Sequence, residues 1–483
     1  MLGRVKVRSK RGLCEIKPAV EYARAALLTL GLVIASNASM GESSSGPGLA
    51  PDCTNPILPG YFADPSMVQY EGKAYLYATL DPWGGETLGC WESSDLSNWT
   101  YRELNWPTKV ECTSLTSKDA MVWAPSVVQG TDGRFYMYVS VGSEVWAGSA
   151  DHPLGPWRNL LGDQPLIPED FKPGYHMIDA EAFVDDDGQV YLYWGSGWNW
   201  VNGKCWVGKL DPDMVTLDGE VLDVTPSNFF EAPFMVKRHG RYFLMYSNGK
   251  TTTDTYQVHY AVGDSPLGPF EEAGNSPILV TDRKSNILSP GHHAVFRHEG
   301  EDYILYHRHS IPFDPEAIGR QVCLGPIQFL ADGTISKIQP SHQAPVWAQG
   351  RVEGDQRLAV NAVATSSGNQ EGARAAYAFD NNYATRWVAS GRDAWLQVDL
   401  GEEREIGKQV IRLEYPWKHY RFTVEASEQG EEWEVVADFT KTPATGSPVL
   451  IEHRVRSRFF RLVFFDDTAD PVPAVFEWNL LER

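Results

Sequence analysis

One short pattern recurs five times between residues 63 and 308. Each copy has a polar or small residue, a few apolar residues, a turn that contains Gly, and a stretch in which Tyr alternates with apolar residues. Such a copy predicts two antiparallel strands joined by a hairpin. The copies are ADPSMVQYEGKAYLYAT from Ala63, WAPSVVQGTDGRFYMYVS from Trp123, IDAEAFVDDDGQVYLYWG from Ile178, FEAPFMVKRHGRYFLMYS from Phe230 and GHHAVFRHEGEDYILYHR from Gly291.

The spacing of the copies predicts how the strands assemble. They begin about 50 to 60 residues apart, which leaves room for one four-stranded antiparallel sheet in each unit. The segments HPLGPW from His152 and SPLGPF from Ser265 also close the second and fourth units alike. Five such sheets bury both of their faces when they are arranged radially, as in a five-bladed β-propeller. Stacked β-sandwiches are the alternative, but the matched unit starts favour the propeller.

A propeller brings residues at one position of the repeat together. The first strand of each blade lines the central channel, so equivalent residues meet around the axis at one end. In this alignment the equivalent residues are Asp64, Ala124, Asp179, Glu231 and His292. The sequence therefore predicts that three carboxylates from the first, third and fourth units converge.

Three converging carboxylates suit the hydrolysis of a glycosidic bond. Crowding separates their pKa values, so one carboxyl keeps its proton while another is ionised, and the reaction needs one acid and one base. Glu231 stands between Phe230 and Phe234, which favours its neutral form, so we expect it to be the acid. Asp64 is then the base, and Asp179 orients and tunes the acid. A calcium site, or acids that cap blade turns, are the alternatives.

The motifs ADPS, WAPS, IDAEAFVDDDG and FEAPFM resemble the blade starts of glycoside hydrolase family 43. This is a family of inverting enzymes with five-bladed propellers, which includes β-xylosidases, α-L-arabinofuranosidases, arabinanases and some galactosidases. The resemblance covers roughly residues 55 to 340. It implies that Asp64 is the general base, Asp179 the carboxylate that modulates the pKa of the acid, and Glu231 the general acid. One departure is Ala180, where the family usually has Pro.

The resemblance and the tryptophans add candidate substrate contacts. The segment SPGHH resembles a Gly-His segment of the family, which places His292 near the channel centre, where some members bind calcium or water. Arg320 resembles the Arg that contacts the sugar in the first subsite. Trp123 directly precedes a channel position, so we expect it to be a sugar platform. Three further tryptophans near blade starts are also candidate sugar platforms, with core packing as the alternative: Trp194, Trp198 and Trp200.

The chain changes character after the propeller. Residues 341–356 are polar without a period and are typical of a linker, and residues 357–483 carry short strands that predict a β-sandwich. The string YAFDNNYATRWVA, with AWLQVDLG and FEWNLLE later, resembles the coagulation factor type C (discoidin-like) fold, to which carbohydrate-binding module family 32 belongs. The resemblance implies a structural calcium ion held by Asp380, Thr385 and Glu477. Trp417, His419 and Tyr420 are candidates for a binding face or for the core.

The first 48 residues predict a signal-like leader and a linker. Basic residues precede the apolar run AALLTLGLVIAS at residues 25–36, and small residues follow it. This pattern is typical of a secretory signal, so we expect a secreted or periplasmic protein, with an uncleaved anchor as the alternative. Cys90 and Cys112 are close enough in sequence to pair after export, and without a CxxC motif we expect no zinc site.

Composition narrows the class of ligand. The net charge of −21 disfavours nucleic acid and anionic membranes as partners, because both require basic surface. The chain has 17 Trp, 21 Tyr and 20 Phe, which suits platforms for the flat apolar faces of sugars. A neutral carbohydrate is the partner that fits both features.

Together these features predict an all-β protein in four parts: a leader at 1–48, a propeller hydrolase domain at 49–340, a linker at 341–356 and a discoidin-like sandwich at 357–483. The function we expect is inverting hydrolysis of α-L-arabinofuranosyl or β-D-xylosyl linkages of plant polysaccharides or oligosaccharides, without an organic cofactor. The alternatives are a catalytically silent sugar-binding protein, a galactosidase, and a retaining fructan-type hydrolase. The fructan-type Asn-Asp-Pro start and Glu-Cys acid motif are missing here.

Overall fold

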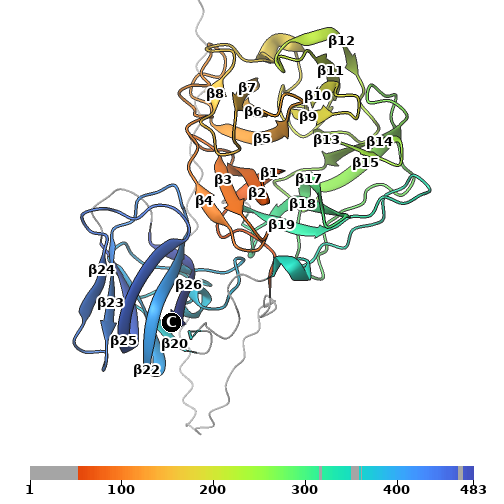
Figure 1. Ribbon diagram of the computed structural model, residues 1–483. Coiled ribbons are helices and arrows are strands. Elements are labelled where there is room, and N and C mark those ends of the chain that lie inside the picture. Colours follow the sequence, from red (N-terminus) through yellow and green to blue (C-terminus); the bar gives the residue numbers. More distant parts are fainter. Residues whose placement is uncertain (1–52, 315–317, 350–357, 360–361, 466–471, 483) are drawn as a thin grey trace, which may run out of the picture. The chain divides into compact units, whose positions relative to one another are not determined.

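The computed structural model describes residues 53–314, 318–349, 358–359, 362–465 and 472–482, and most of its regular structure is β-strand. Its first five sheets are the blades, which we number along the chain (Figure 1). Blade one joins β1 (Phe62–Tyr70), β2 (Lys73–Leu80), β3 (Gly89–Ser93) and β4 (Thr100–Arg102). Blade two joins β5 (Val122–Gln129), β6 (Phe135–Val141), β7 (Val145–Ala150) and β8 (Arg158–Asn159). Blade three joins β9 (Glu181–Val184), β10 (Val190–Trp194), β11 (Trp206–Leu210) and β12 (Leu217–Asp223).

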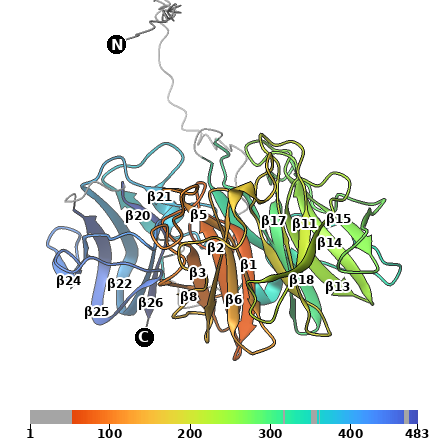
Figure 2. The same ribbon diagram turned by 90° about the horizontal axis from the view of Figure 1, so that it is seen from above.

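The last two blades complete the ring. Blade four joins β13 (Glu231–Arg238), β14 (Arg241–Asn248), β15 (Gln257–Gly263) and β16 (Glu271–Glu272). Blade five joins β17 (Gly291–His298), β18 (Glu301–His309) and β19 (Arg320–Pro326). The innermost strands form a closed circle, because β1 contacts both β5 and β17, β9 contacts both β5 and β13, and β13 contacts β17. Figure 2 shows these strands side by side along the axis. The predicted five-bladed propeller is confirmed.

The segment before β1 is hydrogen-bonded to the last blade of the propeller. The Ile57 backbone N–H donates to the Val322 carbonyl at 2.9 Å. The Asn55 side chain donates to the Leu324 carbonyl at 2.8 Å and accepts the Leu324 N–H at 3.0 Å. The segment therefore lies along β19, where blade five has no fourth strand among the described residues.

The C-terminal domain is an antiparallel sheet of seven strands that folds around one apolar core. Its strands are β20 (Val363–Ser366), β21 (Trp387–Val388), β22 (Ala394–Leu413), β23 (Phe422–Ser427), β24 (Glu434–Asp438), β25 (Val449–Phe464) and β26 (Ala474–Glu482). They pair in the order β21-β26-β22-β25-β23-β24, and β20 pairs with β22. The all-β prediction for this domain is confirmed. Tyr420 lies in its core and Trp417 packs against Phe62, so neither forms an open binding face.

Three short 3-10 helices lie within the described residues: η1 (Glu169–Phe171), η2 (Val346–Ala348) and η4 (Ala375–Ala378). No helix in the described part of the chain is both long and apolar enough for a membrane crossing. The predicted leader, residues 1–48, lies outside the described residues. In η2, the Trp347 ring nitrogen donates to the Tyr303 hydroxyl at 2.9 Å, so this part of the predicted linker packs on blade five.

Residues 47–483 form one compact unit, within which side chains join the two domains. The Arg412 guanidinium donates to the Trp99 carbonyl at 3.1 Å, and the Arg386 guanidinium lies 5.1 Å from the centre of the Tyr61 ring. The Gln321 side chain donates to the Tyr383 carbonyl at 2.8 Å. The sandwich thus packs against the propeller.

The pairing that closeness in sequence allows between Cys90 and Cys112 is not formed. Both residues are buried in the apolar core that blades one and two share, and both keep free thiols. Burial raises the pKa of the Cys112 thiol to about 12, so it stays protonated. Closeness in sequence is not sufficient for a disulfide, because the two Cα–Cβ bonds must also point toward each other.

Candidate active site

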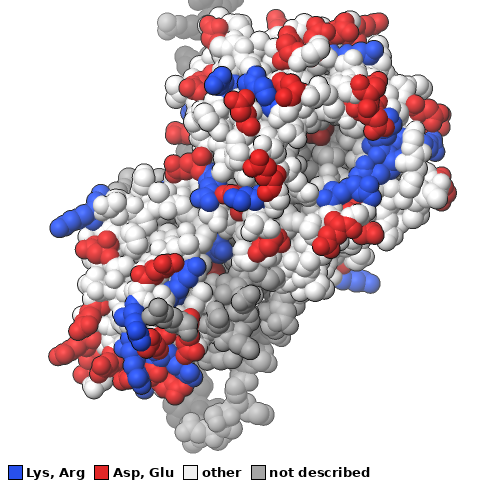
Figure 3. All heavy atoms as spheres, in the orientation of Figure 1, with Lys and Arg blue, Asp and Glu red and all other residues white. Residues whose placement is uncertain are grey.

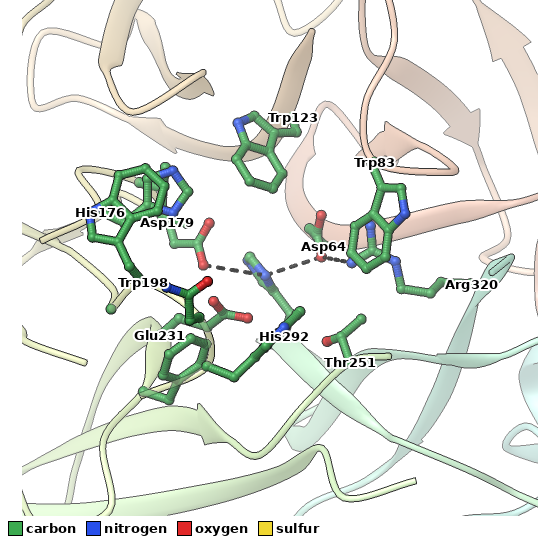
Figure 4. Close-up of a pocket in the computed structure, with 15 residues that line it drawn as sticks. Asp64, Trp83, Trp123, His176, Asp179, Trp198, Glu231, Thr251, His292 and Arg320 are labelled. Atoms are coloured by element: carbon green, nitrogen blue, oxygen red, sulfur yellow. Dashed lines mark hydrogen bonds and ion pairs between the residues drawn. The ribbon is translucent and has the colours of Figure 1, made fainter. Parts of the chain in front are cut away.

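A cavity of about 330 Å³ lies over the channel and takes lining residues from all five blades (Figure 4). All six site residues predicted for the propeller line it: Asp64, Trp123, Asp179, Glu231, His292 and Arg320. Asp64 and Arg320, which are 256 positions apart in the sequence, meet here. The propeller therefore forms one polar centre from distant segments.

A distorted residue starts each blade at this end of the channel. Its φ is positive in all five blades: +51° at Asp64, +44° at Ala124, +56° at Asp179, +55° at Ala232 and +39° at His292. In four blades the register of the first two strands also shifts here, as at a β-bulge. Non-glycine residues adopt this conformation rarely, and a bulge changes the direction of a side chain. The distortion thus turns these side chains toward the axis.

The predicted position of Glu231 in the repeat is wrong by one residue. The positive φ of blade four lies at Ala232, and Glu231 pairs with Ser247 just as Trp123 pairs with Ser140. Glu231 is therefore equivalent to Trp123, and not to Asp64. Aligning the Ala-Pro pair of WAPS with that of EAPF would have shown this register. The carboxyl still lines the cavity, but it arrives from the residue before the distortion.

Each distorted residue is held by the blade that precedes it. Its backbone N–H donates to a side chain of that blade, and four of these acceptors lie on the blade's second strand. The pairs are Asp64 to His307, Ala124 to Thr79, Asp179 to Ser140 and His292 to Ser247, at 2.7 to 3.3 Å. Blade three has Gly195 at the equivalent place, and the Asp179 carboxylate accepts the Ala232 N–H instead. These bonds lock the five starts into one ring.

Asp64 is surrounded by donors. Its carboxylate accepts from Arg320 at 2.9 Å and from the Thr79 hydroxyl at 2.7 Å, and it lies 3.1 Å from Nδ1 of His292. Burial by itself raises the pKa of Asp64, but Arg320 and His292 outweigh it and hold the pKa well below the usual range. Asp64 is therefore ionised across the physiological range.

Arg320 is itself fixed by a second carboxylate. The Asp81 carboxylate accepts from the Arg320 backbone N–H at 2.7 Å and from its guanidinium at 2.6 Å. The guanidinium also lies 5.1 Å from the centre of the Trp83 ring. Arg320 thus reaches Asp64 with a preset geometry.

Burial raises the pKa values of the other two carboxyls. Burial raises the pKa of Glu231, although its oxygens accept the Tyr256 hydroxyl at 2.7 Å and the Ser196 hydroxyl at 3.1 Å. Burial, together with the charges of Glu231 and Asp64, raises the pKa of Asp179 to about 8. A proton is thus held on this side of the cavity at neutral pH.

His292 lies between the two kinds of carboxyl. Its Nδ1 is 3.1 Å from Asp64 and 3.8 Å from Asp179. Burial alone would lower the pKa of His292, but Asp64 and Asp179 raise it to about 9. Its imidazolium lies next to Asp64 and Asp179, and Figure 4 shows Glu231 close to it as well.

Several cavity residues were not predicted. Trp83, His176 and Thr251 line the cavity, and Tyr256 and Ser196 hold Glu231. They come from loops and later strands, and the blade-start motif contains none of them. Among the candidate platforms, Trp198 and Trp200 line the cavity, whereas Trp194 is fully buried in the core.

The predicted calcium ligands lie close together in the sandwich, Asp380 and Thr385 in one loop and Glu477 on β26. The Thr385 hydroxyl donates to Asp380 at 2.7 Å, and the Glu477 carboxylate accepts the Asn381 N–H at 2.9 Å. Within the described ranges, no group of three or more His, Cys, Asp or Glu side chains is arranged to hold a metal. Two carboxylates and a hydroxyl suit calcium only with backbone carbonyls as further ligands, so this ion stays a prediction.

The geometry can support acid–base chemistry on a neutral ligand. One side of the cavity presents an ionised carboxylate, the other a carboxyl whose pKa is raised by burial, and aromatic rings line the wall between them. A paired acid and base of this kind is what glycoside hydrolysis requires. Both acidic and basic side chains occur over the face seen in Figure 3.

Comparisons with known proteins agree with this chemistry. The model of Glycosyl hydrolases family 43 matches residues 53–335, and the model of the F5/8 type C domain matches residues 361–478. A β-D-galactofuranosidase of Aspergillus niger, xynD, is 33% identical over 297 residues, which are 58% of this chain and 83% of that protein. A xylosidase/arabinosidase of Bacteroides ovatus is 27% identical over 59% of this chain and 97% of that protein. A solved structure described as a glycoside hydrolase has a TM-score of 0.73 and 27% identity, and covers 88% of this chain and 98% of its own.

Proposed function

Since the chain belongs to glycosyl hydrolases family 43, we propose that it cleaves α-L-arabinofuranosyl or β-D-xylosyl linkages with inversion. The substrates we propose are plant polysaccharides or their oligosaccharides, met outside the cell after export by the predicted leader. The observation that carries the proposal is that one cavity holds Asp64 beside cationic groups and Glu231 hydrogen-bonded to hydroxyl groups, and that their pKa values are shifted in opposite directions. The Bacteroides relative, named for both activities, supports this choice of sugars.

In the proposed reaction the two carboxyls act on opposite sides of the sugar. Asp64 takes a proton from a water molecule, whose oxygen attacks the anomeric carbon. The bond from that carbon to the glycosidic oxygen breaks, and its electron pair stays on the leaving oxygen, which takes the proton of Glu231. The free sugar therefore has the opposite anomeric configuration. The chemistry needs water and no organic cofactor.

Asp179 and His292 have supporting roles in this proposal. Ionising Asp179 and Glu231 together is disfavoured, because both are buried in one pocket, so this pair keeps a proton until the glycosidic oxygen takes it. His292 and Arg320 keep Asp64 ionised, so the base is ready to accept a proton. Arg320 and Trp123 are also the proposed contacts of the bound sugar.

A second candidate substrate is a β-D-galactofuranoside. The relative with 33% identity is named a β-D-galactofuranosidase. The ring of β-D-galactofuranose has the same configuration as that of α-L-arabinofuranose, and the sugar differs by one added hydroxymethyl group. The same acid and base therefore suit both sugars. A pocket separates such substrates only by how it accommodates that group.

The test is proton NMR of the first product released from 4-nitrophenyl α-L-arabinofuranoside, β-D-xyloside and β-D-galactofuranoside. We expect the inverted sugar from one of the first two, and on the order of 10²-fold or greater loss of kcat in Asp64→Asn on these substrates and in Glu231→Gln on an oligosaccharide, whose leaving oxygen needs a proton. Asp187→Asn, an exposed hairpin carboxylate, is the matched control and should keep full activity.

Three results would contradict the proposal. A retained anomer would make Asp64 a nucleophile, as in the fructan-type mechanism. Turnover of the galactofuranoside alone would select the second candidate. Binding of glycans without turnover of any substrate would indicate a silent sugar-binding protein.

A further inference from the structure

The mouth of the cavity contains a stacked aromatic pair that the proposed acid and base do not use. The rings of His176 and Trp198 lie 4.1 Å apart with 25° between their planes. Trp198 is 43% exposed and lines the cavity, which is unusual for so large an apolar side chain. The His176 ring also lies 5.8 Å from that of Trp123, so it is wedged between two tryptophans. One face of the Trp198 indole is therefore backed by protein.

The pair lies on the acid side of the cavity. Figure 4 shows Trp198 and His176 beside Asp179 and Glu231, whereas Trp83 and Arg320 lie beside Asp64. An acid that protonates the glycosidic oxygen must face the leaving group, and the base must face the opposite side of the sugar. Whatever stacks on Trp198 is thus on the leaving-group side of the bond.

Main-chain bonds tie the pair to the acid. His176 and Ser196 exchange backbone hydrogen bonds of 3.2 and 2.9 Å, and the Ser196 hydroxyl donates to Glu231 at 3.1 Å. A single residue thus connects the platform to the group that donates the proton.

The loop that carries Trp198 has little freedom to move away. Asn199, Trp200 and Asn202 all have positive φ, and an added Cβ at Gly203 would lie 2.1 Å from the Phe230 carbonyl oxygen. The Trp200 ring also lies 5.6 Å from the ring of Phe230, the residue before Glu231. The distance from platform to acid is therefore set by packing, as a binding subsite requires.

The platform suits a neutral ring. Burial lowers the pKa of His176 to about 4, so the imidazole is uncharged at neutral pH. An uncharged aromatic face binds the apolar face of a sugar without attracting or repelling charge.

On the basis of the proposed function, we infer that Trp198, backed by His176, binds the leaving-group sugar, so that the enzyme acts on glycosyl groups attached to a neutral pyranose of an oligosaccharide or polysaccharide. Trp198 is thus a specificity-determining residue and takes no part in proton transfer. The inference extends the proposed function from the sugar that is released to the chain from which it is released.

Two substrates with the same glycosyl group separate the platform from the chemistry. One carries that group on xylotriose, which reaches Trp198, and the other carries it on methanol, which does not. Both leaving oxygens need the proton of Glu231. We expect Trp198→Ala to lower kcat/KM about ten-fold for the xylotriose substrate and by less than about two-fold for the methyl glycoside. Trp198→Phe should restore most of the difference.

Phe465→Ala is the matched control, because it removes a 45% exposed ring of the sandwich and should change neither rate. Equal losses on both substrates in Trp198→Ala would show that the loop only shapes the site, and unchanged rates on both would show that nothing binds the ring. Either result would overturn the inference while leaving the proposed function intact. A wild type that hydrolyses neither substrate, nor any of the 4-nitrophenyl glycosides, would instead overturn the proposed function.

Discussion

At the scale of single residues, the site separates three identical functional groups by their neighbours. Asp64 has a guanidinium and an imidazole within 3.1 Å, so its ionised form is favoured in spite of complete burial. Glu231 has only hydroxyl donors, and burial dominates its pKa. Burial and the charges of Glu231 and Asp64 raise the pKa of Asp179 to about 8, although His292 lies 3.8 Å away. Only Asp64 accepts from a guanidinium, and there the cationic contacts outweigh desolvation.

The separation predicts the effect of Asp179→Asn on the pH profile. The acid works while protonated, so activity falls as pH rises through its raised pKa. Asp179→Asn removes the carboxyl whose ionisation opposes that of Glu231, so the pKa of Glu231 should fall and the alkaline limb of kcat/KM should move to lower pH. The Asn side chain can still accept the Ala232 N–H, which preserves the blade start. Rates measured from pH 4 to 10 on an oligosaccharide test this, and an alkaline limb that stays in place or moves up would contradict the role of Asp179.

At the scale of elements, the start of each blade contributes more to the geometry of the site than the strand that follows it. Each start has a residue in the left-handed region, a conformation that costs about 1 to 3 kcal/mol and persists only when its surroundings hold it. The hydrogen bonds from preceding blades supply that support. The Thr79 hydroxyl contacts two blade starts, because it accepts the Ala124 N–H at 2.7 Å and donates to the Asp64 carboxylate at 2.7 Å.

Replacing Thr79 therefore tests the ring. Thr79→Val keeps the shape but leaves the buried Ala124 N–H without an acceptor, so the free energy of unfolding should fall by about 1 to 3 kcal/mol. Thr79→Ser keeps the hydroxyl and should stay within about 1 kcal/mol of the wild type. Urea denaturation followed by tryptophan fluorescence measures both values. Equal stability of the Val variant and the wild type would show that the bond contributes nothing.

The loop from Asp380 to Thr385 tests the predicted calcium ion in the sandwich. If the ion binds only the folded state, free calcium at 100 times its Kd should stabilise the protein by about 2.7 kcal/mol after treatment with EDTA. Glu477→Gln removes one carboxylate ligand and should abolish the gain. Thermal unfolding with and without added calcium measures it, with magnesium as the control ion. An identical midpoint in calcium and in EDTA would refute the site.

At the scale of the whole molecule, the two domains share an interface that reaches toward the site. Gln321, which donates to the Tyr383 carbonyl of the sandwich, follows Arg320 directly. Tyr61, which lies against Arg386 of the sandwich, is three residues from Asp64. Two of the proposed catalytic and binding residues thus have a neighbour in sequence that contacts the second domain. The sandwich therefore braces the propeller, whether or not it also binds glycan.

We expect the two domains to unfold in one cooperative transition. Arg412→Ala removes a buried donor to the Trp99 carbonyl and should lower the stability of the whole unit by about 1 to 3 kcal/mol. Arg454→Ala breaks an ion pair in which the Arg454 side chain is 68% exposed, and it should change stability by less than about 1 kcal/mol. Differential scanning calorimetry tests both variants. Two separate transitions in the wild type would show that the interface does not couple the domains.

The repeat in the sequence already predicts the architecture and most of the residues that meet at the channel. A repeat of hairpins predicts the five blades, because period-2 alternation is a local property, and a radial ring is a way to bury both faces of such sheets. The same repeat indicated that Asp64, Asp179, Glu231 and His292 converge. Residues whose role follows from their place in the repeat were therefore predictable.

The register of Glu231, the residues that reach the site from outside the motif and the pKa values of the carboxyls depend on the tertiary structure. It showed that Glu231 stands one residue before the bulge, because a bulge changes register without changing composition. It brought Tyr256, Ser196 and His176 to the site from outside the motif, through contacts between segments that no local pattern relates. It also separated the protonation of Asp64 from that of Glu231, because a pKa depends on burial and on charges a few ångströms away, and a sequence specifies neither directly.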